Sequence, residues 1–451
     1  MSTISANFAG CENIIILIID MKLDVVLGLQ WGDEGKGKIV DYLAETYQVI
    51  ARFQGGPNAG HSIHFEGNKY VLRSVPSGVF RKGTINIVGS GVVLDPVTFR
   101  GECEAIEAAG IPLKERLYIS KKVHLILPTH KIIDAAQEAS KGKAKIGSTL
   151  KGIGPTYTDK VSRVGLRVGD ILAANFKERF GALKAKHLEY LRAFDFEFNA
   201  DEHEAEWLEA IEYLKNFKLI DGEYFTNECL ENNKKILAEG AQGSMLDIDF
   251  GSYPFVTSSN TICPGACVGL GIAPRNVGRV WGIFKAYCTR VGSGPFPTEL
   301  NDETGERLRN NGAEFGAVTG RPRRCGWLDL VALKYAIMLN GVTDLIMMKA
   351  DVMDDFDTIK VATSYIVDGE PCKIFPFDTQ ADIQPVYKEF KGWHKPLGAA
   401  RSESDFPYEF RVFLKFIEEE LRIPVKIISV GPDREQTIMR EEEYPTQYRQ
   451  K

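Results

Sequence analysis

The feature that most restricts the fold of this chain is a glycine-rich loop between an apolar run and an amphipathic segment. Residues 32–38 read Gly-Asp-Glu-Gly-Lys-Gly-Lys, close to the phosphate-binding pattern Gly-x4-Gly-Lys-[Ser/Thr]. The run 25–27 before the loop predicts a strand, and residues 39–45 after it predict a helix. Glycines let backbone amides turn towards phosphate oxygens, and a helix N-terminus adds a partial positive charge. The order strand, loop, helix therefore predicts an α/β fold like that of P-loop NTPases.

One residue departs from the phosphate-binding pattern. Ile39 stands where a Ser or Thr hydroxyl would ligate magnesium. We expect the carboxylate of Asp33, inside the loop, to hold the metal instead. A glycine-rich turn with no ligand is the alternative, but the two lysines and the strand–helix context favour phosphate binding.

Short apolar runs rich in Val and Ile alternate with helical patterns along the rest of the chain. Such runs are typical of a mostly parallel central sheet that is buried on both faces. A helix is expected from Leu328 to Leu339, because Asn340-Gly341 is a favoured C-terminal cap. We expect a single large α/β domain over residues 21–451. Its further strands are predicted at 85–88, 345–348 and 425–428.

Two kinds of segment stand apart from this alternation. Residues 172–238 are highly charged, poor in glycine and helical in pattern, so they predict a helical insertion on the sheet. The loops 152–155 and 292–297 are rich in Gly and Pro and long for connectors. Because long loops in compact domains are often functional, we expect them to be active-site loops.

The ends and the composition exclude several classes of protein. Residues 1–20 are expected to be an N-terminal extension upstream of the native start. Their apolar run 14–19 is shorter than the about 20 residues that span a bilayer, and no basic segment precedes it, so neither a membrane span nor a signal peptide is expected. The net charge of −6 argues against nucleic-acid or membrane partners. Eight scattered cysteines without paired C-x2-C sets predict reduced thiols, no zinc site and a cytoplasmic location.

Longer motifs around the loop are more specific. Residues 30–38, followed by Gln-Gly-Gly-Pro-Asn-Ala-Gly-His at 54–61, resemble the signature pair of the adenylosuccinate synthetase family. The resemblance extends in the family's order from about residue 24 to 440. Its further motifs are 152–155, 239–243, 256–260, 319–324 and 431–434.

The resemblance implies a GTP-dependent carbon–nitrogen ligase (EC 6.3.4.4) that joins IMP and L-aspartate. The products are adenylosuccinate, GDP and phosphate, formed through 6-phosphoryl-IMP in the first committed step from IMP to AMP. It implies Asp33 as the base that removes the proton from N1 of IMP, and His61 as general acid/base. Lys36 and Gln242 are the other implied catalytic residues. One Mg²⁺ per subunit would be held by Asp33 and the carbonyl of Gly60.

The implied substrate contacts fall into three overlapping sets. For GTP they are Gly32, Asp33, Glu34, Gly35, Lys36, Gly37, Lys38, Gly60, His61, Ser62, Arg323, Lys349, Ala350, Asp351, Ser429, Val430 and Gly431. For IMP they are Asp33, Glu34, Gly35, Lys36, Asn58, Ala59, Gly60, His61, Thr149, Arg163, Gln242, Thr257 and Arg321. For aspartate they are Ala317, Val318, Thr319, Gly320, Arg321, Pro322 and Arg323, since a guanidinium binds a carboxylate bidentately.

Arg163 matches a residue that the family donates across a two-fold interface, which implies a homodimer with shared active sites. Three positions depart from the common family pattern. They are Lys151 for Arg, Val318 for Thr, and Met348 for the Asn or Thr that usually precedes Lys-x-Asp in the guanine motif.

Three other functions share part of this pattern. A GTP-binding switch protein would have the phosphate loop and Lys-x-Asp, but would not need residues 58–61 or an arginine-bearing loop. A second alternative is another ligase or kinase on the same scaffold, with a different nucleotide acceptor. A third is an inactive relative kept as a binding protein, against which the intact Asp33, His61, Lys36 and Arg321 argue.

Overall fold

The computed structural model describes residues 22–65, 67–142, 145–316, 320–378 and 381–440. Within these ranges, ten strands form one sheet in the order β20-β19-β15-β11-β1-β10-β2-β5-β7-β9. Every neighbouring pair is parallel except the edge pair β19–β20. The bounds are β1 Leu23–Gly28, β2 Val49–Arg52, β5 Ile85–Val88, β7 Leu117–Ser120, β9 Lys218–Ile220, β10 Ile236–Glu239, β11 Val277–Lys285, β15 Asp344–Met348, β19 Val425–Ser429 and β20 Thr437–Met439.

The mostly parallel sheet confirms the predicted fold class. The predicted strand runs coincide with β1, β5, β15 and β19. Helix α1 (Lys36–Leu43) begins three residues before the predicted start, inside the glycine-rich loop, because Gly35 adopts a left-handed conformation as its N-cap. Helix α11 (Leu330–Asn340) ends at the predicted cap, with Gly341 left-handed.

The sheet is buried on both faces, as the apolar runs require. Alternate residues of β1 enter different cores: Val25 and Leu27 join the larger cluster, whereas Val26 joins a second one with Ile39 and Val40 of α1. The remaining helices are α2 Pro96–Ala108, α3 Leu113–Arg116, α4 Pro128–Ser140, α5 Ile153–Ser162, α6 Phe176–Leu191, α7 Glu204–Leu214, α8 Gly222–Glu231, α9 Pro264–Leu270, α10 Glu303–Asn311 and α12 Tyr408–Leu421.

The segment 172–238 is only partly the helical insertion that its composition predicts. It contains α6, α7 and α8, but also β9 at the sheet edge and most of β10, which lies between β1 and β2. The strand signal was hidden because β9 has three residues that are not buried and β10 is a four-residue run beside a lysine pair. The C-terminal part of the segment therefore belongs to the central sheet.

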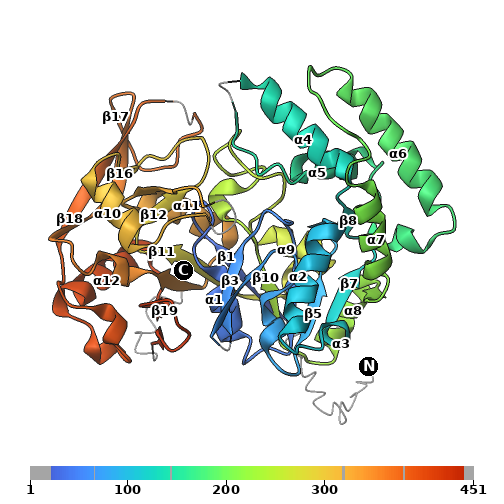
Figure 1. Ribbon diagram of the computed structural model, residues 1–451. Helices are drawn as coiled ribbons and strands as arrows, with labels where there is room; N and C mark the ends of the chain where they lie inside the picture. Colours follow the sequence, from blue (N-terminus) through green and yellow to red (C-terminus); the bar gives the residue numbers. More distant parts are fainter. Residues whose placement is uncertain (1–21, 66, 143–144, 317–319, 379–380, 441–451) are drawn as a thin grey trace, which may run out of the picture.

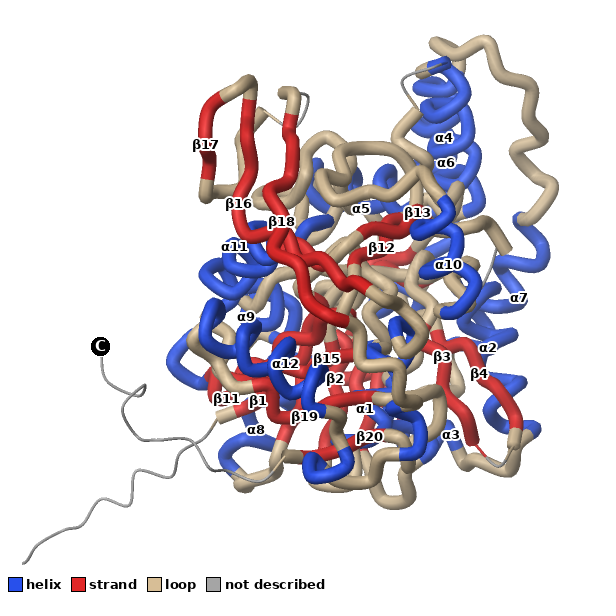
Figure 2. Tube along the Cα trace, turned by 90° about the vertical axis from the view of Figure 1, so that its left-hand side faces the viewer, coloured by secondary structure: helices blue, strands red, loops and turns tan. Residues whose placement is uncertain are grey.

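Smaller sheets flank the central one. Strands β16, β17 and β18 form an antiparallel group that lies at the opposite end of the molecule from α2 and α7 (Figures 1 and 2). The small-sheet strands are β3 His61–Phe65, β4 Asn68–Leu72, β6 Val93–Leu94, β8 His124–Leu125, β12 Cys288–Arg290, β13 Arg324–Gly326, β14 Leu328–Asp329, β16 Thr358–Val367, β17 Glu370–Cys372 and β18 Ile383–Lys391. No helix in the described ranges is long and apolar enough to cross a membrane.

The side chain of Trp207 in α7 allows a test of how much the helices of residues 172–238 contribute to the stability of the fold. The side chain is fully buried, stacks on Phe180 at a 5.0 Å centroid distance, and donates its indole N–H to the carbonyl of Ile126 at 2.8 Å. We expect Trp207→Ala to lower the free energy of unfolding by about 3–5 kcal/mol in chemical denaturation. Tyr224→Ala removes a side chain that is 76% exposed, so it should change stability by no more than about 0.5 kcal/mol. Equal effects of the two substitutions would contradict this packing.

Candidate functional site

Five strands in a row of six parallel neighbours lead into predicted site residues. In sheet order the row is β19, β15, β11, β1, β10 and β2. At or just after the carboxyl ends of the five lie Ser429 to Gly431 (β19), Lys349 to Asp351 (β15), the glycine-rich loop (β1), Gln242 (β10), and Asn58 to His61 (β2), whereas β11 leads to Tyr287, which was not predicted. Ligands of open α/β sheets bind at this edge. The order along the sheet thus runs from the predicted guanine contacts, through the phosphate loop, to the predicted IMP contacts.

A buried carboxylate shapes the phosphate loop from inside. Glu34 is fully buried, and its Oε1 accepts hydrogen bonds from the backbone N–H of Gln30 at 3.1 Å and of Gly32 at 2.9 Å. A Cβ on Gly28 would lie 2.2 Å from Glu34 Oε2, so only glycine leaves room for this carboxylate. Asp33, which precedes Glu34, has φ 58°, a conformation that is costly for a residue with a side chain. The loop is therefore held in a strained shape by Glu34.

The two loop lysines already have protein partners. Lys36 Nζ donates to Glu34 Oε2 at 2.6 Å and to the carbonyl of Gln242. Lys38 Nζ donates to Ser429 Oγ and the Gly431 carbonyl, both at 2.7 Å. Burial lowers the pKa of Lys38 to about 8, against the opposing effect of nearby aspartates. Lys38 thus ties the phosphate loop to the loop after β19, and its expected contact with GTP phosphates stays a prediction.

Asp33 faces an arginine. Arg323 Nε lies 2.7 Å from Asp33 Oδ2, and Arg323 Nη1 donates to Glu314 Oε2 at 2.6 Å. Arg323 is the last residue of the segment predicted to bind aspartate, so the structure brings the predicted base and that end of the segment together. The Asp33 side chain keeps 35% of its surface exposed, which leaves it accessible to a ligand.

His61 is held against the phosphate loop by a buried glutamate. His61 Nδ1 lies 2.5 Å from Glu239 Oε1, and the same oxygen accepts from Ser77 Oγ at 2.6 Å. Burial and the charge of Arg52 hold the pKa of His61 below its ordinary value, although Glu239 acts in the opposite direction. A Cβ on Gly37 would lie 2.8 Å from His61 Cβ, so the backbone and Cβ of His61 pack directly on the loop.

Several buried polar atoms of the site lack a hydrogen-bond partner within the described part of the chain. Because an unsatisfied buried polar group is costly, such atoms mark where a ligand's donors and acceptors belong. Burial raises the pKa of Asp351, whose carboxylate therefore gains from donors such as a purine N–H. The atoms are His61 Nε2, Asn58 Oδ1, Gln242 Nε2 and Asp351 Oδ1.

Other predicted contacts lie outside this cluster. Arg163 is exposed at the left-handed C-cap of α5, and Thr149 is exposed in the loop before α5. Arg321, Gly320 and Pro322 are also exposed, and Thr257 is half-buried. Ala317, Val318 and Thr319 lie outside the described residues, as do residues 1–20. The remaining predicted contacts are half-buried or buried. Ser62 lies in β3, and the segments after β2, β15 and β19 carry Ala59, Gly60, Ala350 and Val430.

A cluster of metal-ligating residue types lies elsewhere, where α4, α5 and α6 meet. His130 Nε2 and His187 Nε2 each lie 2.9 Å from Asp159 Oδ2. The backbone N–H of Leu127 donates to His130 Nδ1 at 2.9 Å, so neutral His130 carries its proton on Nε2. A metal at that nitrogen would need an imidazolate. This cluster is therefore a hydrogen-bonded tie between helices.

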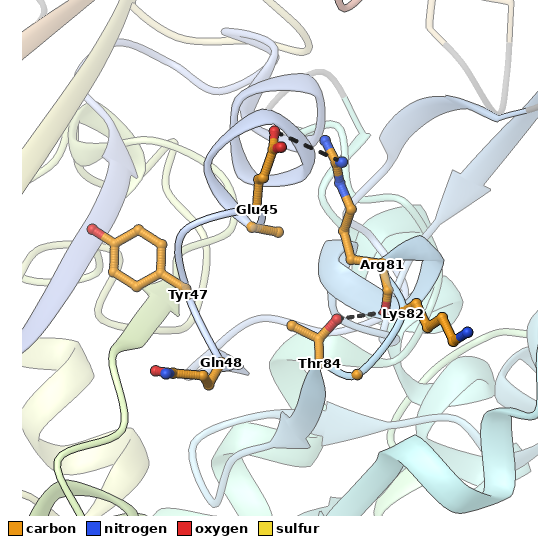
Figure 3. A pocket seen from close by; sticks show the side chains of 8 residues that line it. Glu45, Tyr47, Gln48, Arg81, Lys82 and Thr84 are labelled. Carbon is orange, nitrogen blue, oxygen red and sulfur yellow. Dashed lines mark hydrogen bonds and ion pairs between the residues drawn. The ribbon is translucent and has the colours of Figure 1, made fainter.

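A pocket of about 350 Å³ lies beyond the end of α1 (Figure 3). Its lining is polar at the rim, with an Arg81–Glu45 ion pair at 4.0 Å. None of the predicted site residues lines it, so it adds nothing to the site. The lining residues are Ala44, Glu45, Tyr47, Gln48, Arg81, Lys82, Gly83 and Thr84.

Comparison with known proteins shows the family of the chain. The sequence model of adenylosuccinate synthetase matches residues 25–438. The chain belongs to the adenylosuccinate synthetase family. It is 64% identical over 420 residues to the adenylosuccinate synthetase of Phocaeicola vulgatus, covering 93% of this chain and 99% of that protein. It is 60% identical over 421 residues to that of Porphyromonas gingivalis, with the same coverage.

Solved structures agree with the observed fold. The fully ligated adenylosuccinate synthetase of Plasmodium falciparum superimposes with a TM-score of 0.88 at 38% identity, over 93% of this chain and 100% of that one. A cyanophage S-2L succinoaminodeoxyadenylate synthetase shares the fold, with a TM-score of 0.61 at 21% identity. The chain is an adenylosuccinate synthetase of purine biosynthesis, and it converts IMP to adenylosuccinate on the route to AMP. Its family uses GTP.

Sequence reasoning missed the residues that hold the functional groups in place. Glu239 was noticed only as the first residue of a motif, and Glu314, Lys285 and Tyr287 were not singled out. Glu239 had one usable signal, since it ends an apolar run and an ionised residue at the carboxyl end of a buried strand is often functional. Glu314 follows no such run, so nothing local distinguished it.

The His61–Glu239 pair gives a direct test of positioning. Glu239→Gln keeps the shape but no longer fixes the imidazole proton on Nδ1, so we expect kcat to fall about 10–100-fold. Ser77→Ala removes a donor to Glu239 but leaves its contact with His61, so its loss should be smaller. Steady-state kinetics with folded variants checks both. A Glu239→Gln enzyme with more than half of the wild-type kcat would exclude this role.

Proposed function

We propose that the ligase works in two steps, through 6-phosphoryl-IMP, with GTP as phosphoryl donor. The observation that carries this proposal is His61, a buried acid/base packed on the phosphate loop with its Nε2 unpartnered among the described residues. A protein that only binds or hydrolyses GTP needs no such group on the acceptor side. The enzyme is proposed to work in the cytoplasm.

In the first step, Asp33 takes the proton from N1 of IMP. The electrons of the N1–H bond pass to the 6-oxygen, which attacks the γ-phosphorus of GTP while the bond to the β-phosphate oxygen breaks. Asp33 must be free of Arg323 for this transfer, because a paired carboxylate is a weaker base. Proton transfer by a positioned group is typically worth ~10²–10⁴-fold.

His61 assists the phosphoryl transfer. An anionic phosphoryl group beside Nε2 favours the imidazolium, and buried Glu239 stabilises that charge at the other ring nitrogen. The Nε2–H then donates a hydrogen bond to the migrating group. Lys36 of the phosphate loop adds a positive charge beside the migrating group. The amide of Gln242 holds the purine.

In the second step, the neutral amine of aspartate attacks C6, the C6–O bond breaks so that phosphate leaves with the 6-oxygen, and the extra proton of the amine passes to the departing phosphate. Arg321 and Arg323 are proposed to bind the aspartate carboxylates as bidentate forks. Residues 317–323 together form the proposed aspartate contacts. Arg323 therefore has two partners in turn, since it pairs with Asp33 before it meets aspartate.

A magnesium ion fits the donors at the loop. Asp33 offers a carboxylate that is one-third exposed, and Gly60 offers a backbone carbonyl. Both are hard oxygen ligands of the kind that Mg²⁺ prefers. When bound, the ion neutralises charge on the phosphates.

Guanine recognition is assigned to the loops after β15 and β19. Asp351 accepts from N1–H and the 2-amino group of guanine, which adenine lacks. The stem of Lys349 covers the face of the base, and Ser429, Val430 and Gly431 close the pocket. The unpartnered Oδ1 of Asp351 supports this assignment.

IMP is proposed to bind across a homodimer. Thr149 and Thr257 contact its phosphate and ribose, and Arg163 comes from the partner subunit. The exposure of Arg163 at the end of α5 supports this role, since a residue donated to another subunit must be on the surface. We propose one α/β domain over residues 21–451, with residues 1–20 outside it.

A coupled assay tests the reaction and its base together. Absorbance should change as IMP becomes adenylosuccinate only when IMP, aspartate, GTP and Mg²⁺ are all present, and ATP should not replace GTP. We expect Asp33→Ala to abolish turnover while GDP still binds. Asp357→Ala removes a carboxylate whose side chain is 92% exposed, and should leave the rate unchanged. Full activity of Asp33→Ala would refute the base assignment, and rapid GTP hydrolysis without IMP would favour a switch protein.

Subunit mixing tests the shared site. Arg163→Leu and His61→Ala should each be nearly inactive, but a hybrid dimer has one site with both residues intact. An equimolar mixture that exchanges freely should therefore recover about a quarter of the wild-type activity, by two-fold symmetry. A mixture of His61→Ala with Gln242→Ala is the control, because both residues belong to one subunit's site and no intact site forms. If the first mixture recovers no more activity than the control, Arg163 is not donated by the partner subunit.

A further inference from the structure

Glu314 is a fully buried glutamate surrounded by cations. Its Oε1 accepts hydrogen bonds from Lys285 Nζ and Lys349 Nζ, each at 2.8 Å, and from the hydroxyl of Tyr287 at 2.6 Å. Its Oε2 accepts from Arg323 Nη1 at 2.6 Å. Burial alone would raise the pKa of this carboxyl, but the surrounding cations hold it well below its ordinary value. Glu314 is therefore ionised, and we call it, together with Lys285, Tyr287, Arg323 and Lys349, the Glu314 hub.

The hub lies at the root of the arginine-bearing segment. The backbone N–H of Arg323 donates to the carbonyl of Glu314 at 2.9 Å, and Phe315 pairs with Pro322 in an antiparallel bridge. Glu314 and Arg323 thus face each other where the segment leaves the body of the protein. Lys285 and Tyr287 anchor this root to β11 and the turn that follows it. Any shift of Glu314 must move Arg323.

The hub also reaches the guanine side. Lys349 Nζ donates to Glu314 Oε1 and to the carbonyl of Gly312 at 2.6 Å, two acceptors on one short stretch of chain. Lys349 has a left-handed backbone with φ 58°, and it leads directly into Asp351. One glutamate therefore contacts both the lysine of the base pocket and the arginine that neutralises Asp33.

We infer that Glu314 is a positioning residue that couples guanine binding to aspartate binding. The inference rests on the proposed assignments of Lys349 and Arg323. A base that packs on Lys349 fixes the 312–314 stretch, and this stretch fixes Arg323 at the end of the segment. Arg323 must leave Asp33 to bind aspartate, and the Glu314 carboxylate keeps its guanidinium aligned as it does so. Each ligand thus strengthens the binding of the other.

Calorimetric titration of GDP tests this coupling directly. GDP is added to the protein with Mg²⁺ and IMP, with and without saturating aspartate, a mixture that has no phosphoryl donor and cannot turn over. We expect aspartate to tighten GDP binding at least about 5-fold in the wild type, within the usual range of coupling between sites. In Glu314→Gln, which keeps the shape but loses the charge, the same ratio should fall below about 2-fold.

Two further variants separate coupling from folding. Tyr287→Phe removes one neutral donor and leaves every charge, so it should retain the wild-type ratio. Glu314→Asp keeps the charge but is too short to reach both Arg323 and the lysines, so it should also lose coupling, and it serves if Glu314→Gln does not fold. An unchanged ratio in the folded Glu314 variant, or no effect of aspartate in the wild type, overturns the inference. Failure of the proposed function would instead appear as no wild-type turnover in the absorbance assay.

Discussion

A carboxylate taken out of water must be matched by cations or N–H donors, and the proposed active site contains three such matches. Glu34 pairs with Lys36 in the phosphate loop, Glu239 with His61, and Glu314 with Arg323 and the lysines around it. Each glutamate is buried, and the group that it holds belongs to a residue proposed to contact a substrate. Removing either member of such a pair leaves a buried charge without its partner, so position and stability are linked at this site.

The central sheet decides which of these pairs are neighbours. Because β19, β15, β11, β1, β10 and β2 lie side by side and run parallel, residues far apart in the chain meet at one edge. Lys38 contacts Ser429 across 391 positions of sequence, and His61 contacts Glu239 across 178. The phosphate loop leaves β1 in the middle of this row. A donor nucleotide on one side and an acceptor on the other can therefore share the same loop.

Local patterns predicted the fold class because each depends on a few adjacent residues. The apolar runs of β1, β5, β15 and β19 are short and rich in Val, Ile, Leu and Met, and Gly341 caps α11 through its own backbone. The helical insertion was predicted less well, since β10 is a four-residue strand inside a charged segment. The resemblance supplied the functional residues, but not their supports. The roles of Glu314 and Tyr287 depend on partners that only the fold brings together. No spacing along the chain predicts these contacts.

The departure at Ile39 has a structural reason. Helix α1 begins at Lys36, so residue 39 lies at the end of the first helical turn and points towards the sheet. Ile39 is fully buried, in a core cluster with Val26 and Leu237. A hydroxyl there would face apolar side chains and could not reach a metal without leaving the core. The left-handed turn at Asp33 presents a carboxylate on the outer side of the same loop, so the residue proposed to hold magnesium is also the one that can act on IMP.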